Sequence, residues 1–123
     1  MVEVLVSIFL LGTCLLVITF AFSAGMEYIM MIKERSIATQ SAQECIELIR
    51  DMPFSDILTV SSDFTSPGMN SLDSATGTIT VDNPNGTDDM RRVTITIDWT
   101  SIRGTAESKT LVTFVTRGGI NKQ

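Results

Sequence analysis

The stretch at residues 3–26 reads EVLVSIFLLGTCLLVITFAFSAGM, a single acidic residue followed by an uncharged and almost wholly apolar run. The run itself covers the 23 residues 4–26. At a rise of about 1.5 Å per residue it predicts a helix of roughly 35 Å, which is long enough to cross the hydrocarbon of a bilayer. The rest of the chain is too small and too polar to bury such a helix. We therefore expect the helix to lie in a membrane or against other copies of itself.

A secretory signal peptide that is later removed is the main alternative for this segment. Such a signal begins with a basic region, carries an apolar stretch of about 7–15 residues and ends in small residues at a cleavage site. Here the first basic residue is Lys33, and the helical pattern continues beyond an apolar run that is already too long. The sequence therefore favours a permanent helix.

Composition excludes several classes of function. The chain has 123 residues, enough for one small domain beside the helix, and its net charge of −5 argues against a nucleic-acid partner. Histidine is absent, which removes His-based general bases, Ser-His-Asp triads and His metal ligands. No nucleophile–base pair, metal-binding motif or phosphate-binding loop is recognisable. We expect no enzyme activity, no cofactor and no metal.

The helical period continues after the apolar run, but only on one side. An apolar stripe with steps of three and four residues is formed by Ala38, Ala42, Cys45, Ile46 and Ile49. Pro53 ends the pattern, because the residue before a proline is biased away from helix. The sequence thus predicts one helix over residues 2–52, with a hydrophobic part at 1–27 and an amphipathic part at 28–52. Cys14 and Cys45 would then lie about 46 Å apart, too far for a disulfide.

An irregular connection and a small sheet are predicted for the remainder. Residues 53–77 are rich in turn-forming residues, with Phe54, Ile57 and Leu58 available to pack back on the helix. Residues 78–82, 92–100 and 109–116 have strand patterns. The alternating side chains on one face of the second strand are Val93, Ile95, Ile97 and Trp99. The expected fold is α+β: the amphipathic half of the helix, through Ala42, Cys45, Ile46 and Ile49, packs on an antiparallel sheet of three to four strands within residues 78–123.

The segment at residues 82–89, DNPNGTDD, clusters oxygen-bearing side chains. Such a cluster could hold calcium, but its acidic and amide positions do not follow the EF-hand register. A polar turn between two strands is the simpler interpretation.

The opening at residues 1–12, MVEVLVSIFLLG, resembles the N-terminal helix of type IV pilins and of the pseudopilins of type II secretion and competence systems. In that family a glutamate begins a long apolar helix and a glycine follows nine residues later, as do Glu3 and Gly12 here. The family's glutamate stands two positions further from the mature N-terminus. The resemblance thus implies either that the sequence lacks two mature residues or that it starts at an internal methionine. Phe20 replaces a frequent proline, and the C-terminal cysteine pair of many Gram-negative pilins is missing. Residues 42–50 look, more loosely, like those of minor pilins.

The resemblance implies a pilin-like fold and a role for each part of the helix. Glu3 would pair with the free α-amino group of a neighbouring subunit and so set the register between subunits. In the alternative reading, Glu3 only stands in the headgroup zone, where the helix dipole stabilises it by about 0.3–1 kcal/mol. Gly12 would provide either close helix packing or a point of local melting. The residues assigned to the filament core and membrane helix are Val4, Leu5, Ile8, Phe9, Gly12, Leu15, Leu16 and Phe20.

The resemblance also implies partners and a location. The chain would be held in the cytoplasmic membrane as a single-pass protein with its C-terminal part outside, although Lys33 and Arg35 taken alone suggest the opposite topology. It would then polymerise as a homo-oligomer into a cell-surface filament, with minor pilins as possible companions. Prepilin peptidase and the pilus assembly machinery are implied as further partners. The alternatives are a pseudopilin and a membrane-anchored binding domain that never polymerises.

Overall fold

The computed structural model describes residues 1–84, 86 and 88–118. Their elements are the long helix α1 (Val2–Asp51), the 3-10 helix η1 (Asp56–Thr59), strand β1 (Asp63–Phe64), the 3-10 helix η2 (Pro67–Ser71), and strands β2 (Asp73–Asp82), β3 (Met90–Thr100) and β4 (Ala106–Thr116). Helix α1 is continuous over 50 residues and ends at Asp51, one residue earlier than predicted. The pattern around Pro53 therefore predicted the end of the helix to within one position.

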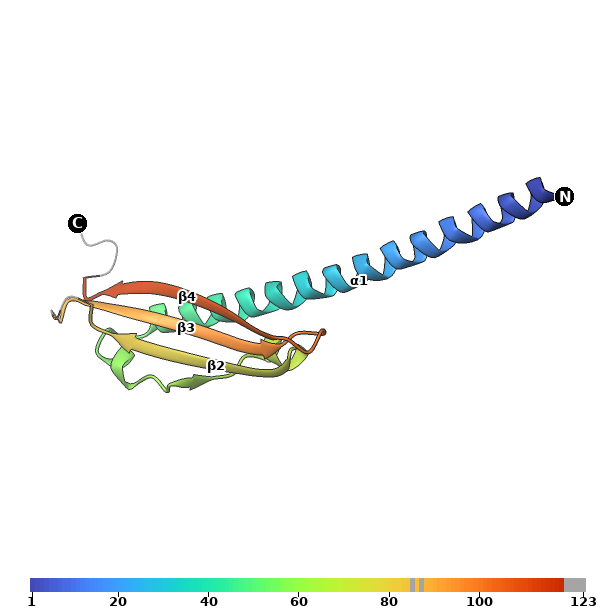
Figure 1. Ribbon diagram of the computed structural model, residues 1–123. Helices are drawn as coiled ribbons and strands as arrows, with labels where there is room; N and C mark the ends of the chain where they lie inside the picture. Colours follow the sequence, from blue (N-terminus) through green and yellow to red (C-terminus); the bar gives the residue numbers. More distant parts are fainter. Residues whose placement is uncertain (85, 87, 119–123) are drawn as a thin grey trace. The chain divides into compact units, whose positions relative to one another are not determined.

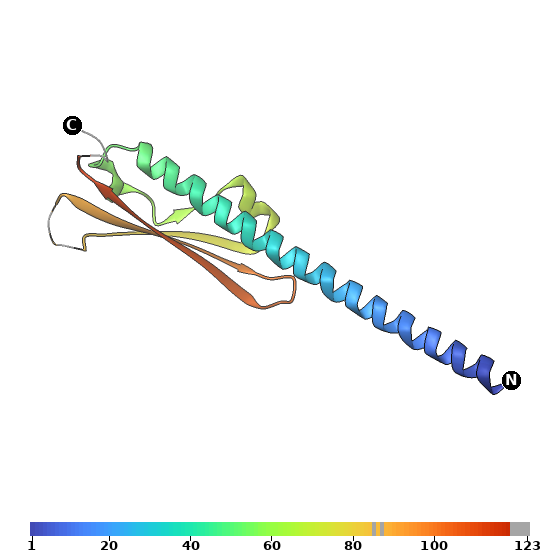
Figure 2. The ribbon, with the colours of Figure 1, turned by 90° about the horizontal axis from the view of Figure 1, so that it is seen from above.

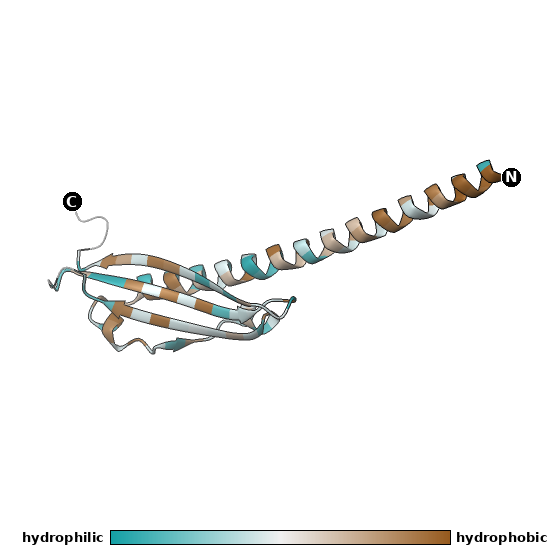
Figure 3. Cartoon of the chain, in the orientation of Figure 1, coloured by the Kyte–Doolittle hydropathy of each residue, from teal (hydrophilic) through white to brown (hydrophobic). Residues whose placement is uncertain are grey.

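The chain divides into two compact units, Met1–Lys33 and Glu34–Gln123. We call the first the stem and the second the head. The stem contains only the first part of α1. Its apolar window is long enough to cross a membrane, and none of that window is buried by the rest of the chain. In Figure 3 most of its N-terminal turns have the colour of hydrophobic residues.

The head contains an antiparallel sheet in which the strands stand in the order β1-β2-β3-β4 (Figure 1). It is an α+β unit, because the last turns of α1 cover one face of this sheet (Figure 2). The predicted strands are longer in the structure: β2 begins at Asp73 rather than 78, β3 at Met90 rather than 92, and β4 at Ala106 rather than 109.

The connection predicted as irregular over residues 53–77 is more ordered than expected. It holds η1, the short strand β1, η2 and the first residues of β2. The sequence DSATG at 73–77 has the composition of a loop, but Thr76 pairs with Asp98 and Gly77 with Ile97 of β3. A long partner strand supplies these hydrogen bonds, and pairing of this kind overrides weak local preference. Strand β2 is irregular between Asp73 and Thr76, where Ser74 takes a positive φ of 52°.

Small residues on α1 let the chain approach the helix closely. Ala38, Ser41 and Ala42 are buried. A Cβ built on Gly68 of η2 would lie 2.7 Å from Ser41 Oγ. Only glycine fits at that distance without movement, so η2 rests directly on the helix.

Candidate functional site

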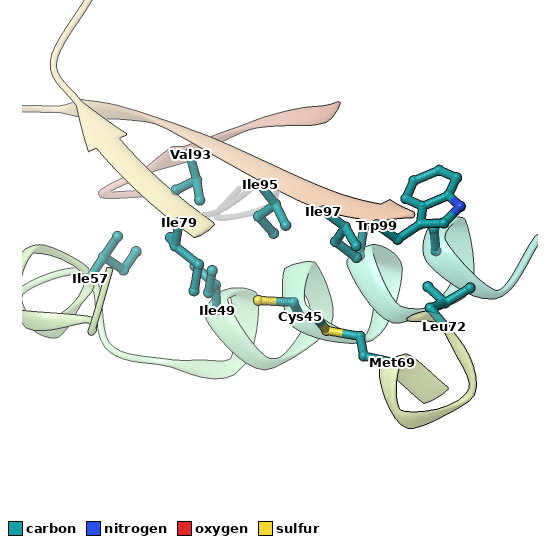
Figure 4. Packing of buried hydrophobic residues seen from close by; sticks show 12 residues of the cluster. Cys45, Ile49, Ile57, Met69, Leu72, Ile79, Val93, Ile95, Ile97 and Trp99 are labelled. Carbon is teal, nitrogen blue, oxygen red and sulfur yellow. The ribbon is translucent and has the colours of Figure 1, made fainter. Parts of the chain in front are cut away.

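The head's core joins the two apolar faces that the sequence identified. The residues assigned to helix–sheet packing that are buried in one cluster are Ala42, Cys45 and Ile49 from α1, and Val93, Ile95, Ile97 and Trp99 from β3 (Figure 4). Ile46 is only partly buried at the margin of this cluster. Sequence reasoning missed Met69 and Leu72, which come from the connection taken as irregular and complete the core.

Two of the three connecting residues expected to pack back on the helix do so. Ile57 is fully buried and Phe54 packs against the core. Leu58 is 55% exposed, and the prediction is wrong for this residue. Because η1 is a single tight turn, it can direct Ile57 inward only by leaving its neighbour outside.

Charged groups stabilise the end of the sheet at which β2 ends and β3 begins. Arg92 donates two hydrogen bonds to Asp82, from Nε to Oδ1 at 2.9 Å and from Nη2 to Oδ2 at 2.7 Å. The Arg92 guanidinium lowers the pKa of the Asp82 carboxyl, mainly through these hydrogen bonds. Arg91 pairs with Asp88 at 3.1 Å and lies over the Phe54 ring.

The turn at 82–89 lies partly outside the described residues, at Asn85 and Thr87. Of its acidic side chains, Asp82 and Asp88 are held by the arginines of β3. Within the described part of the chain, no group of three His, Cys, Asp or Glu side chains could hold a metal ion.

The stem carries the other predicted residues, and it exposes all of them. Val4, Leu5, Ile8, Phe9, Gly12, Leu15, Leu16 and Phe20 are exposed. Cys14, also on the stem, is exposed, while Cys45 is buried in the head; both are free thiols. An apolar helix without any cover is costly in water, at about 25 cal/mol for each Å². The stem therefore needs lipid or other protein around it.

The serine and threonine hydroxyls of the stem donate hydrogen bonds within the helix. Ser7 donates to the Glu3 carbonyl oxygen at 2.8 Å, Thr19 to that of Leu15 at 2.9 Å, and Ser23 to that of Thr19 at 2.8 Å. Thr13 bonds similarly to the carbonyl oxygen of Phe9 at 3.1 Å. These hydroxyls therefore add little cost in an apolar environment. Sequence reasoning missed these bonds, although the predicted helix could have revealed them, because a serine or threonine in a helix can donate to the carbonyl oxygen four residues earlier.

Glu3 is the only acidic or basic residue in the first turns of the stem. Its carboxylate forms no ion pair with any residue that the structure describes. Val4, Ser7, Ile8 and Leu11 lie beside Glu3 on the exposed surface of the stem. A carboxylate beside apolar side chains is costly to bury unless a cation meets it. This arrangement could accept a positively charged group from another molecule.

Comparisons with protein-family models, with curated proteins and with solved structures find no match to this chain. The class that the fold defines is an α+β protein with a long apolar N-terminal helix.

Proposed function

We propose that this protein is a structural subunit of a type IV pilus-like filament. Its stem holds it in the membrane before assembly and packs against other stems in the filament core afterwards. The head then lies outside the membrane, at the surface of the filament. The single observation that supports this proposal best is a stem whose apolar window is wholly unburied while the head has a complete core of its own.

Two features of the stem favour polymerisation over simple anchoring. An anchor needs only an apolar surface of sufficient length. It has no need of a carboxylate at its first turn, nine residues before a glycine. In a bundle of stems, Glu3 would meet the α-amino group of a neighbour, and the charge match would fix the stagger between them. The filament could serve adhesion, motility, DNA uptake or secretion.

Cysteine crosslinking along the stem tests the proposal in cells that express the full chain. Cys14 already supplies one exposed thiol, and single cysteines replace other stem residues in a Cys14→Ala background. If the stems pack regularly, cysteines on one face of the helix give crosslinked products, and cysteines at the positions between them give none. A chain that only anchors a head gives no such periodic pattern. Shearing the cells distinguishes the two filament alternatives, because a major pilin dominates the released fibres and a pseudopilin does not.

A further inference from the structure

The head has an open hollow at the end of α1 that the proposed function does not use. Its volume is about 530 Å³, within the range of about 300–1,000 Å³ that is usual for binding pockets. The side chains that make its apolar floor and wall are Cys45, Leu48, Met52, Val60 and Phe64. Leu48 is 64% exposed and Met52 is 41% exposed. A single head therefore leaves much of this apolar surface in contact with water.

The charges around the hollow are of one sign. Asp56 and Asp63 line it, and no basic residue does among those described. The hydroxyl of Ser55 donates to Asp56 Oδ1 at 2.8 Å, which holds that carboxylate in place. An occupant that matches this site carries an apolar side chain with a cationic group beside it.

A tight turn of the same chain presents such a pair of residues. Between β3 and β4, Ile102 is 54% exposed and is followed by Arg103. The turn is held by hydrogen bonds from the Ser101 amide to the Thr105 carbonyl oxygen at 2.8 Å and from the Gly104 amide to the Ser101 carbonyl oxygen at 2.7 Å. The positive φ of 73° at Gly104 allows it to close. Ile102 is thus displayed on a preorganised turn.

The turn and the hollow lie at opposite ends of the head. The Ile102 amide donates to Glu34 Oε1 at 3.1 Å, at the start of the helical part of the head. The hollow is lined by Met52, just past the end of α1. Eighteen residues of helix separate these two positions, a length of roughly 27 Å. One head therefore cannot fill its own hollow with its own turn.

We propose that the Ile102 turn of one copy inserts into the hollow of the next copy, with Arg103 facing Asp56 and Asp63. This inference rests on the proposed function, because a filament repeats one heterologous contact between two different surfaces of each subunit. An apolar knob in a hollow, rimmed by opposite charges, supplies such a contact between heads. It acts in addition to the packing of the stems.

Paired cysteines test the contact in filaments sheared from cells that express the full chain. Ser61 lines the hollow. Ile102→Cys and Ser61→Cys are introduced together in a background with Cys14→Ala and Cys45→Ala, because Cys45 also lines the hollow and could crosslink to Ile102→Cys by itself. The filaments are then oxidised. Each copy then carries both halves of the contact, so we expect a ladder of disulfide-linked dimers, trimers and higher species. Each single replacement should give no ladder. Val112→Cys with Ser61→Cys is the matched control, because Val112 is 52% exposed but lies on β4, away from the turn.

A second pair of variants tests the charges without cysteines. Arg103→Glu should lower filament yield, and Arg103→Glu combined with Asp63→Arg should restore it. Thermal unfolding in detergent checks that each variant head is folded. Normal filaments without a ladder, or a ladder that stops at dimers, overturn the contact but leave the proposed function standing. A wild-type chain that forms no stem crosslinks and no filaments overturns both.

Discussion

The ring of Phe64 in β1 covers Gly77 in β2, its partner across the ladder. A Cβ at Gly77 would lie 2.5 Å from Phe64 Cε1 and 2.7 Å from the Phe64 carbonyl oxygen. Strand β1 has only two residues, so this contact between a ring and a bare backbone is a large part of what fixes it to the sheet. Glycine in a strand often marks such a close approach.

Replacing Gly77 by alanine should destabilise the head by about 1–3 kcal/mol, the usual cost of forcing a group into a packed site. Denaturant unfolding of the full chain in detergent, followed by the fluorescence of the single tryptophan, measures the change. Thr78→Ala is the control, because Thr78 is the next residue of β2 and is exposed. Equal stability of the two variants would show that β1 moves away at little cost.

Glu3→Ala should leave membrane insertion unchanged and should abolish or strongly reduce incorporation into filaments. Insertion depends on the apolar run, which the substitution preserves, whereas subunit register depends on the lost carboxylate. Membrane fractionation and the yield of sheared filaments measure the two effects separately. Glu3→Asp keeps the charge and is the matched variant. A normal filament yield from Glu3→Ala would leave Glu3 with only its headgroup role.

Substitutions at Gly12 test whether this residue serves close packing of stems or local melting of the helix. No described atom outside the helix backbone lies within 4 Å of a Cβ built on Gly12, so the single chain tolerates a larger residue. We expect Gly12→Leu to insert normally and to lower filament yield, because neighbouring stems approach closely at small residues.

Two further variants complete the test of Gly12. Gly12→Ala strengthens the helix by up to about 1 kcal/mol while adding little volume. It should therefore be tolerated if packing matters and should be harmful if melting matters. Gly25→Leu is the control at a second stem glycine with open surroundings. Equal yields from Gly12→Leu and wild type would remove both roles.

Because of the Asp82–Arg92 pair, we expect the head to lose a little stability in acid. Arg92 holds the pKa of the Asp82 carboxyl below its ordinary value of 3.8. Stability from this pair is therefore complete above that ordinary value and is lost as the pH falls through the lower pKa of the folded state. Because both side chains are more than 40% exposed, salt should weaken the effect.

The measurement for this pair is denaturant unfolding of the full chain in detergent across the acid range. Asp82→Asn should be less stable than wild type at neutral pH, and the difference should shrink at pH values below about 4. Asp89→Asn removes an exposed carboxylate of the following turn and is the control. If the difference in stability between wild type and Asp82→Asn stays constant down to the lowest pH, the pairing is contradicted.

Cys45 should resist alkylation while the head is folded. Cys45 is 6% exposed, and burial raises the pKa of its thiol, so little reactive thiolate is present at neutral pH. In a Cys14→Ala background, labelling by a bulky maleimide should appear only at the denaturant concentration that unfolds the head. A chain with both Cys14→Ala and Cys45→Ala is the blank. Rapid labelling without denaturant would show that the hollow opens to admit the reagent.

Local patterns were enough to predict the long helix and the faces that pack together. The period of three and four residues identified Ala42, Cys45 and Ile49, and the alternation in β3 identified Val93 to Trp99, because each pattern places its apolar residues on one side of a regular element. The uncharged and almost wholly apolar run at 4–26 indicated in the same way a helix that the head does not cover.

The tertiary structure alone decided the path of residues 53–77 and the features that depend on it. Composition marked this segment as a loop, yet Met69 and Leu72 enter the core, and Phe64 pairs with Gly77. The hollow with its two carboxylates exists only because η1 and β1 pass beside the end of α1. Local sequence predicts regular elements through their periodicity, whereas a segment without a period takes its conformation from the surfaces that it contacts.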